Sequence, residues 1–260
     1  MQKLPSFFIG HGSPMNAIES NPITKSWSDL GLTLGSPKAI LVISAHWYIS
    51  ELCLSAQSTN QTIHDFYGFP EKLANYEYPS HGSVSIANEI SKLLANHGIK
   101  IQLTENIWGL DHGAWSVLTH MFPKPQIPIL QLSIPNNQPP AWHFKLGEML
   151  KPLRENNILI IGSGNIVHNL GMLDWHKPNS GYDWAISFDQ YIVKSIQARN
   201  FDAIINYNKF GHSAQLAIPT LDHFLPLLYI LGLIDNEDSI NIFNQYYQYG
   251  SLSMTSVRVG

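Results

Sequence analysis

Three runs of apolar, often β-branched residues in this chain each end at a histidine. The runs and the histidines that follow them are 6–10 with His11, 39–45 with His46, and 158–167 with His168. Short runs of this kind are typical of strands buried on both faces, as in a parallel sheet. The carboxyl ends of parallel strands form one edge, where open α/β sheets bind their ligands, so we expect the imidazoles to gather there. Several imidazoles in one place can bind one ion, and the pattern therefore indicates a metal site.

The rest of the chain alternates short apolar runs with longer stretches of helical spacing. We expect strands near residues 6–10, 39–46, 51–56, 99–104, 127–134, 157–163 and 252–258. We expect helices near residues 82–97, 112–121, 140–155, 183–199 and 219–233. This order predicts an α/β fold, a single domain over residues 1–260 with a central, mainly parallel or mixed β-sheet flanked by helices. The metal site is expected at the strand ends, and the polar tract 206–213 is expected to form a loop over the pocket.

Composition and charge exclude several classes of partner. The net charge is −4 and no basic stripe is present, which argues against nucleic acid. The one cysteine, Cys53, excludes an internal disulfide and a Cys-rich zinc site. The longest strongly apolar stretch, 224–234, contains a proline and is too short to span a bilayer, and the N-terminus lacks the pattern of a signal peptide. We therefore expect a soluble, cytoplasmic protein with no membrane partner.

The twelve histidines have to be weighed one by one, because a single histidine is usually a surface residue or a satisfied core residue. Position favours a metal-binding role for His11, His46 and His168, which follow strands. It also favours this role for His223, which precedes an apolar helical stretch. No two histidines form a local metal-binding pair, so ligation has to be assembled from distant parts of the chain. Six others are expected to be structural or exposed: His81, His97, His120, His143, His176 and His212.

Two further histidines lie in segments with two readings. His112 stands between aromatic residues, glycines and an acid, where it is either a substrate contact or metal-supporting donor, or a packed residue behind a helix cap at Asp111. His64 and Asp65 begin an aromatic loop over 64–70, which is either a clasp for a planar ligand or simply a packed loop. The sequence alone leaves both pairs of readings open.

The glycines around Ser163 do not form a known nucleotide or hydrolase motif. The dinucleotide spacing G-x-G-x-x-G is absent because position 167 is valine, and no P-loop lysine follows. Gly162-Ser163-Gly164 is not the G-x-S-x-G elbow of serine hydrolases. We expect these glycines to let the backbone approach a ligand closely beside His168.

Six spaced motifs carry a resemblance to a known family. They lie at residues 8–16, 44–47, 63–66, 109–113, 162–170 and 223–227. In this order they resemble the DOPA 4,5-extradiol dioxygenase-like family, a branch of the class III extradiol ring-cleaving dioxygenases. The resemblance runs from residue 6 to residue 254 and so covers nearly the whole chain.

The resemblance implies one divalent metal per chain, held by His11, His46 and His223. It places His168 beside the metal, as an acid/base or as a fourth ligand. The broader class uses two histidines and a glutamate, and the position that matches the glutamate is His223 here. An all-imidazole set suits zinc as well as Fe(II), but zinc is redox-inert. We therefore expect zinc in isolated or crystallised protein and Fe(II) in the active dioxygenase.

The resemblance further implies that the enzyme inserts both atoms of O2 into a catechol such as L-DOPA, opening the ring at the 4,5 position. His168 is expected to take the catechol proton and return it, since imidazole titrates in the required range. His112 is expected to hydrogen-bond oxygen or a substrate hydroxyl. The substrate contacts are expected to be His64, Asp65 and Ser13. The partners are then a small catechol and O2, with the chain a monomer or small homo-oligomer.

Two other functions use the same residues. A zinc hydrolase would act through a metal-bound water with His168 as base, although no H-E-x-x-H glutamate neighbours a ligand. A metal-binding protein without turnover would need the ligands alone, and an acid/base beside the ion argues against it.

Overall fold

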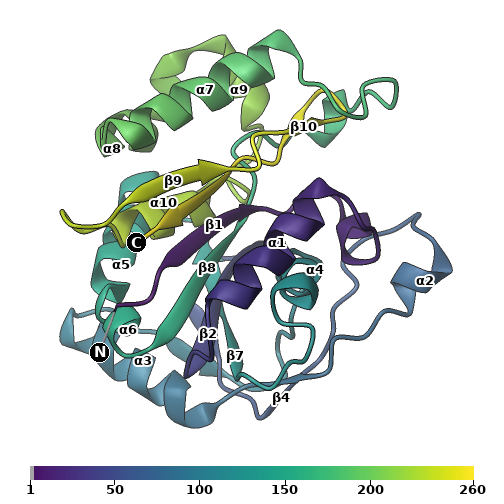
Figure 1. Ribbon diagram of the computed structural model, residues 1–260. Coiled ribbons are helices and arrows are strands. Elements are labelled where there is room, and N and C mark those ends of the chain that lie inside the picture. The colour runs from purple at the N-terminus through teal and green to yellow at the C-terminus, as the bar shows by residue number, and fades with distance from the viewer. Residues whose placement is uncertain (1–2) are drawn as a thin grey trace.

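The computed structural model describes residues 3–260, which fold around one eight-stranded sheet (Figure 1). Its strand order is β6-β3-β7-β2-β8-β1-β12-β9. The strands of this sheet are β1 Ser6–Gly10, β2 Ala39–Ile49, β3 Cys53–Ser55, β6 Gln102–Thr104, β7 Ile129–Pro135, β8 Ile158–Gly164, β9 Ile240–Phe243 and β12 Ser256–Val259. The central strands β7, β2, β8 and β1 run parallel, whereas β3 is antiparallel to β7 and β12 is antiparallel to β1. The predicted mixed α/β sheet is confirmed.

Helices cover both faces of the sheet, because the buried strands are apolar on both sides. Ile40 and Val42 of β2 pack in the core beneath α1 (Pro22–Thr33) and α4 (His112–Met121). Leu41 and Ile43 pack in the core on the other side. The helices of that side are α3 Val84–Asn96, α5 Pro140–Leu150, α7 Asp183–Gln197, α9 His212–Ala217 and α10 Leu225–Gly232. The layers are visible in Figure 1, where α1 and α4 lie side by side on one face.

The remaining elements are short. They are η1 Pro14–Ala17, β4 Thr59–Asn60, α2 Glu71–Ala74, β5 Ser80–His81, α6 Pro152–Glu155, η2 Leu170–Met172, α8 Phe201–Ile205, η3 Tyr207–Phe210, β10 Tyr247–Gln248 and β11 Leu252–Ser253. Within residues 3–260, no helix combines the length and the apolar character that crossing a membrane requires.

Several expected boundaries differ from the structure for local reasons. The helix expected over 140–155 is two helices, α5 and α6, because Pro152 has no N–H to continue the first one. The helix expected from 219 begins at Leu225. The strand expected over 252–258 is divided into β11 and β12. The tract 206–213 is not an open loop, since it contains η3 and the start of α9. Helix α1 and strand β9 were not expected at all.

Candidate metal centre

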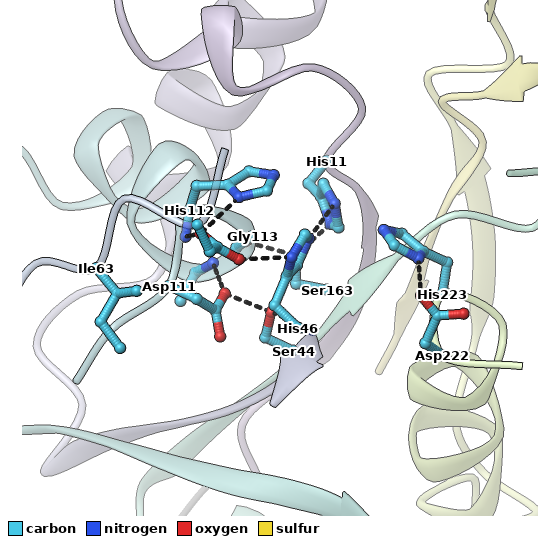
Figure 2. A network of polar contacts seen from close by, with 12 residues as sticks. His11, Ser44, His46, Ile63, Asp111, His112, Gly113, Ser163, Asp222 and His223 are labelled. Carbon is cyan, nitrogen blue, oxygen red and sulfur yellow. Dashed lines mark hydrogen bonds and ion pairs between the residues drawn. The ribbon is translucent and has the colours of Figure 1, made fainter. Parts of the chain in front are cut away.

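His11, His46 and His223 come together at the carboxyl edge of the central strands (Figure 2). His11 follows β1, His46 lies near the end of β2, and His223 lies two residues before α10. One ring nitrogen of each lies within 4.8 Å of those of the other two. The Nε2 atoms of His11 and His46 are 3.3 Å apart. The sequence placed the first two at strand ends and His223 before an apolar helical stretch, and the structure brings all three together.

The end of β8 holds two of these histidines in place. The carbonyl of Gly164 accepts a hydrogen bond from the backbone N–H of His11 at 3.1 Å. The next residue, Asn165, donates its N–H to the carbonyl of His223 at 2.9 Å. A side chain at Gly164 would place its Cβ 2.1 Å from that same carbonyl oxygen, so only glycine allows the approach.

His46 lies at an irregularity of its strand. The register of β2 against β7 shifts between Ile43 and Tyr48, and His46 lies inside this interval. Such irregularities redirect a side chain that a regular strand would aim elsewhere.

Each of the three rings has its Nδ1 atom bound by protein. Nδ1 of His11 donates to Ser163 Oγ at 2.9 Å, because the Ser163 hydroxyl itself donates to the carbonyl of Gly113. Nδ1 of His46 lies 2.6 Å from a carboxylate oxygen of Asp65. Nδ1 of His223 lies 2.7 Å from Asp222 Oδ2. In a neutral ring whose Nδ1 carries the proton, Nε2 is an acceptor only.

The three Nε2 atoms are therefore acceptors that face one another with no donor among them, an arrangement that a cation stabilises. Zinc binds imidazole nitrogen at about 2.0–2.1 Å, and two such nitrogens on a tetrahedral ion lie about 3.3 Å apart. The separation of 3.3 Å between His11 and His46 fits this geometry. Carboxylate partners on the far nitrogen, as His46 and His223 have, are also typical of metal-binding histidines. The residues fit a metal ion.

Burial and neighbouring charges shift the pKa values of several site residues in opposite directions. Burial lowers the pKa of His11 well below its usual value, and the neighbouring His46 lowers it further. Burial also lowers the pKa of His46, but the hydrogen bond to Asp65 and the charge of Asp111 outweigh it, so the net shift is upward. Burial raises the pKa of Asp222, yet its bond to His223 holds the net value well below the usual range. The site thus combines imidazoles with ionised carboxylates, which favours a bound cation.

Two more histidines border the three. The ring of His168 stacks on that of His223, with centroids 3.4 Å apart and planes 6° from parallel. The ring of His112 lies on the other side, with its centroid 4.0 Å from that of His46. Five imidazoles from different parts of the chain therefore line one site.

Comparison with known proteins identifies the family. The profile described as the catalytic LigB subunit of aromatic ring-opening dioxygenase matches residues 7–260. The chain belongs to the LigB family. An Escherichia coli (strain K12) protein named 4,5-DOPA dioxygenase extradiol is 44% identical to this chain, and the match covers 99% of the chain and 95% of the relative. A Beta vulgaris protein of the same name is 34% identical over 97% of this chain and 95% of its own.

A solved structure supports the same assignment. The crystal structure of an uncharacterized Escherichia coli K12 protein superposes with a TM-score of 0.87 at 40% sequence identity, covering 99% of this chain and 100% of that one. This LigB-family chain is thus an oxidoreductase of the ring-opening dioxygenase class. Dioxygenases of the family depend on a metal, and the histidine cluster could bind one.

The residues expected to touch substrate in this LigB-family chain all have protein partners. His64 Nε2 lies 2.8 Å from the carbonyl of Tyr76. The Ser13 hydroxyl accepts a hydrogen bond from Met15 N and caps η1. Asp65 lies against the rings of His46 and His112. Their contact with a substrate stays a prediction.

Three polar residues that contact the site histidines or their neighbours were not expected from the sequence to belong to the site: Ser163, Asp222 and Asp111. Asp222 is adjacent to His223, and this Asp-His pair was a visible signal. Asp111 is the N-cap of α4, as one reading of the sequence proposed, and it also accepts a hydrogen bond from Ser44 at 2.6 Å. Nothing in the sequence indicates that Ser163 contacts His11, because the two lie 152 positions apart.

Proposed function

We propose that this chain is an extradiol dioxygenase that inserts both atoms of O2 into a catechol such as L-DOPA, opening the ring at the 4,5 position. The observation that carries the proposal is the set of three Nε2 acceptors on His11, His46 and His223, which face one another without a donor. Family membership and relatives named for DOPA dioxygenation support the reaction and the substrate class.

The three histidines would hold one divalent metal. When bound, Fe(II) supplies the Lewis acidity and electron transfer that let a coordinated catechol react with O2, whereas zinc supplies Lewis acidity alone. We expect zinc in isolated protein, since imidazole ligands suit both ions, and Fe(II) in the active enzyme. The proposed ligands come from residues far apart in the sequence, so a bound metal would also link β1, β2 and the segment before α10.

His168 is proposed as the acid/base. Burial lowers the pKa of His168 well below the usual value, with a further contribution from His223, so the ring is neutral and its lone pair is free to accept a proton only from an acidic group such as a metal-bound hydroxyl. It takes the proton of a catechol hydroxyl and returns it during ring opening. Its stacking on His223 keeps the ring beside the metal-binding residues.

His112 is proposed to hydrogen-bond the substrate. Its ring is buried and packs against His46 and against the aromatic ring of Phe66, whose centroid is 5.5 Å away. The loop that carries His64 and Asp65 packs against the same region, and together with Ser13 these residues are the proposed substrate contacts. The aromatic surroundings suit a planar ring.

Oxygen consumption tests the function directly. Protein stripped of metal is reconstituted without oxygen with Fe(II) or Zn(II), then mixed with L-DOPA and air. We expect O2 uptake and a yellow ring-opened product with Fe(II) alone. Substitution His223→Ala should abolish both, whereas His176→Ala, which changes an exposed histidine, should leave them unchanged. If the Fe(II) protein consumes no O2 with L-DOPA or with a panel of catechols, the proposed function is wrong.

A further inference from the structure

The carboxylate of Asp65 lies between two of the site histidines. One oxygen, Oδ2, is 2.6 Å from Nδ1 of His46. The other, Oδ1, is 2.8 Å from Nδ1 of His112 and 3.1 Å from the backbone nitrogen of the same residue. Figure 2 shows the two imidazoles on the same side of the centre, away from His223. One side chain thus contacts a proposed metal ligand and a proposed substrate contact at the same time.

An ionised carboxylate accepts hydrogen bonds and donates none. Both oxygens of Asp65 face an imidazole Nδ1, and Oδ1 also accepts from the backbone N–H of His112, so the carboxylate is surrounded by groups that donate to it. Both Nδ1 atoms must therefore carry the proton. In the neutral rings, Nε2 of His46 and Nε2 of His112 are then both acceptors.

The loop around Asp65 is fixed to the start of α4 by main-chain contacts. Ile63 donates its N–H to the carbonyl of Leu110 at 2.7 Å, and Leu110 donates its own to Gln61 at 2.8 Å. The indole of Trp115 donates to the carbonyl of Ile63 at 2.9 Å. The carboxylate is therefore held at a fixed place relative to α4, whose first residue is His112.

We propose that Asp65 is a positioning residue that holds His46 and His112 in the Nδ1–H tautomer, so that His46 offers Nε2 to the metal and His112 offers Nε2 to a hydroxyl of the substrate. The part that concerns the substrate rests on the proposed function, whereas the tautomers do not. A neutral His112 in this form cannot donate a hydrogen bond from Nε2 to dioxygen. The geometry thus selects the catechol hydroxyl, rather than O2, as the partner of His112.

The tautomers can be measured without turnover. Long-range proton–nitrogen NMR spectra of protein with 15N-labelled histidine distinguish the Nδ1–H from the Nε2–H form of each ring. Spectra are recorded for the metal-free protein and after addition of Zn(II), with His46 and His112 assigned from the variants His46→Gln and His112→Gln. We expect both rings to be Nδ1–H in the wild-type protein. An Nε2–H signal from either ring in the metal-free protein would overturn the proposal.

Substitution Asp65→Asn sharpens the test, because one of the two carboxylate oxygens becomes an NH2 group, which donates to the ring beside it instead of accepting from it. We expect one of the two rings to change tautomer and the affinity for Zn(II) to fall about 10- to 100-fold, as for other residues that support metal-bound histidines. Asp65→Glu keeps two acceptor oxygens and should retain both Nδ1–H forms. Asp29→Asn, which changes an exposed aspartate in a helix, is the matched control.

The outcomes separate this inference from the proposed function. Unchanged tautomers and a zinc affinity equal to that of Asp29→Asn would mean that Asp65 does not position the two rings. A tautomer change in a protein that cleaves no catechol would support the positioning role and contradict the function. If Asp65→Asn does not fold, the wild-type spectra still decide, because they require no variant at position 65.

Discussion

The imidazoles of His168 and His223 lie face to face, 3.4 Å apart between centroids and 6° from parallel. Parallel rings in contact direct their nitrogens alongside one another rather than toward a common point between them. Consistent with this, the potential metal-binding atoms that lie within 4.8 Å of one another in the described part of the chain belong to His11, His46 and His223. His168 is not in this group. The stacking therefore favours His168 as an acid/base beside the metal over His168 as a fourth ligand.

Substitution His168→Gln tests this assignment. Glutamine keeps a polar side chain of similar size but cannot take up a proton at neutral pH. We expect ring cleavage to fall by roughly 10²–10⁴-fold, the usual contribution of a general acid/base, while Fe(II) remains bound. Oxygen uptake and metal content are measured on the same preparation, with His176→Gln as control. Loss of the metal in His168→Gln would instead make His168 a ligand.

Gly164 is the position where a small change should disturb the metal site most selectively. An added Cβ would lie 2.1 Å from the carbonyl oxygen of His223, and backbone on both sides cannot yield without moving that ligand. We expect Gly164→Ala to weaken Zn(II) binding by roughly tenfold or more, measured by competition with a chelating dye. Gly171→Ala is the control, because the nearest atom to its Cβ is 3.3 Å away on the side chain of Asn169. Equal zinc affinity in the two variants would contradict this account.

The central strands and their histidines could be predicted from the sequence because burial on both faces requires continuous apolar runs. The runs before His11 and His46 became β1 and β2, and the run before His168 became β8. Helix α1 was missed although its cap, Asn21 with Thr24, stands in the sequence, since its apolar positions are diluted by polar ones. The sequence therefore predicts the fully buried strands well, because their burial requires apolar residues throughout. It predicts a helix with one exposed face less well, because polar residues interrupt its apolar pattern.

The contacts of Asp65 with two imidazoles could not be predicted from the sequence. The two rings that Asp65 touches lie 19 and 47 positions away, and their approach depends on how the loop after β4 pairs with residue 110. Asp65 was expected to bind substrate, because it lies in an aromatic loop that could hold a planar ligand and in a motif that resembles the family. Only the fold shows that both of its oxygens already have imidazole partners.

The buried side chain of Arg154 bonds to residues near both ends of the chain. Its guanidinium is fully buried and donates to Asp238 at 2.7 and 3.1 Å, and to the carbonyls of Leu4 and Val259. Replacing it with methionine removes these donors and leaves Asp238 with Lys3 as its remaining charged partner. We expect Arg154→Met to lower the free energy of unfolding by about 3–5 kcal/mol in urea titrations. Lys25→Met, on the surface, should change it by less than about 1 kcal/mol, and a similar loss in both would contradict the prediction.

His143 is not among the clustered site histidines and should make stability depend on pH. Burial lowers its pKa to about 4 from 6.5, despite the backbone contact with Gln138. The unfolded chain therefore binds this proton first, and the free energy of unfolding falls as the pH drops from about 6.5 to about 4. The loss should be on the order of 3 kcal/mol. His143→Gln can keep the hydrogen bond with Tyr229 but does not titrate, so its stability should fall less over this range. Urea titrations at pH 7 and pH 4 measure the difference, and parallel losses in the two proteins would show that His143 is not the titrating group.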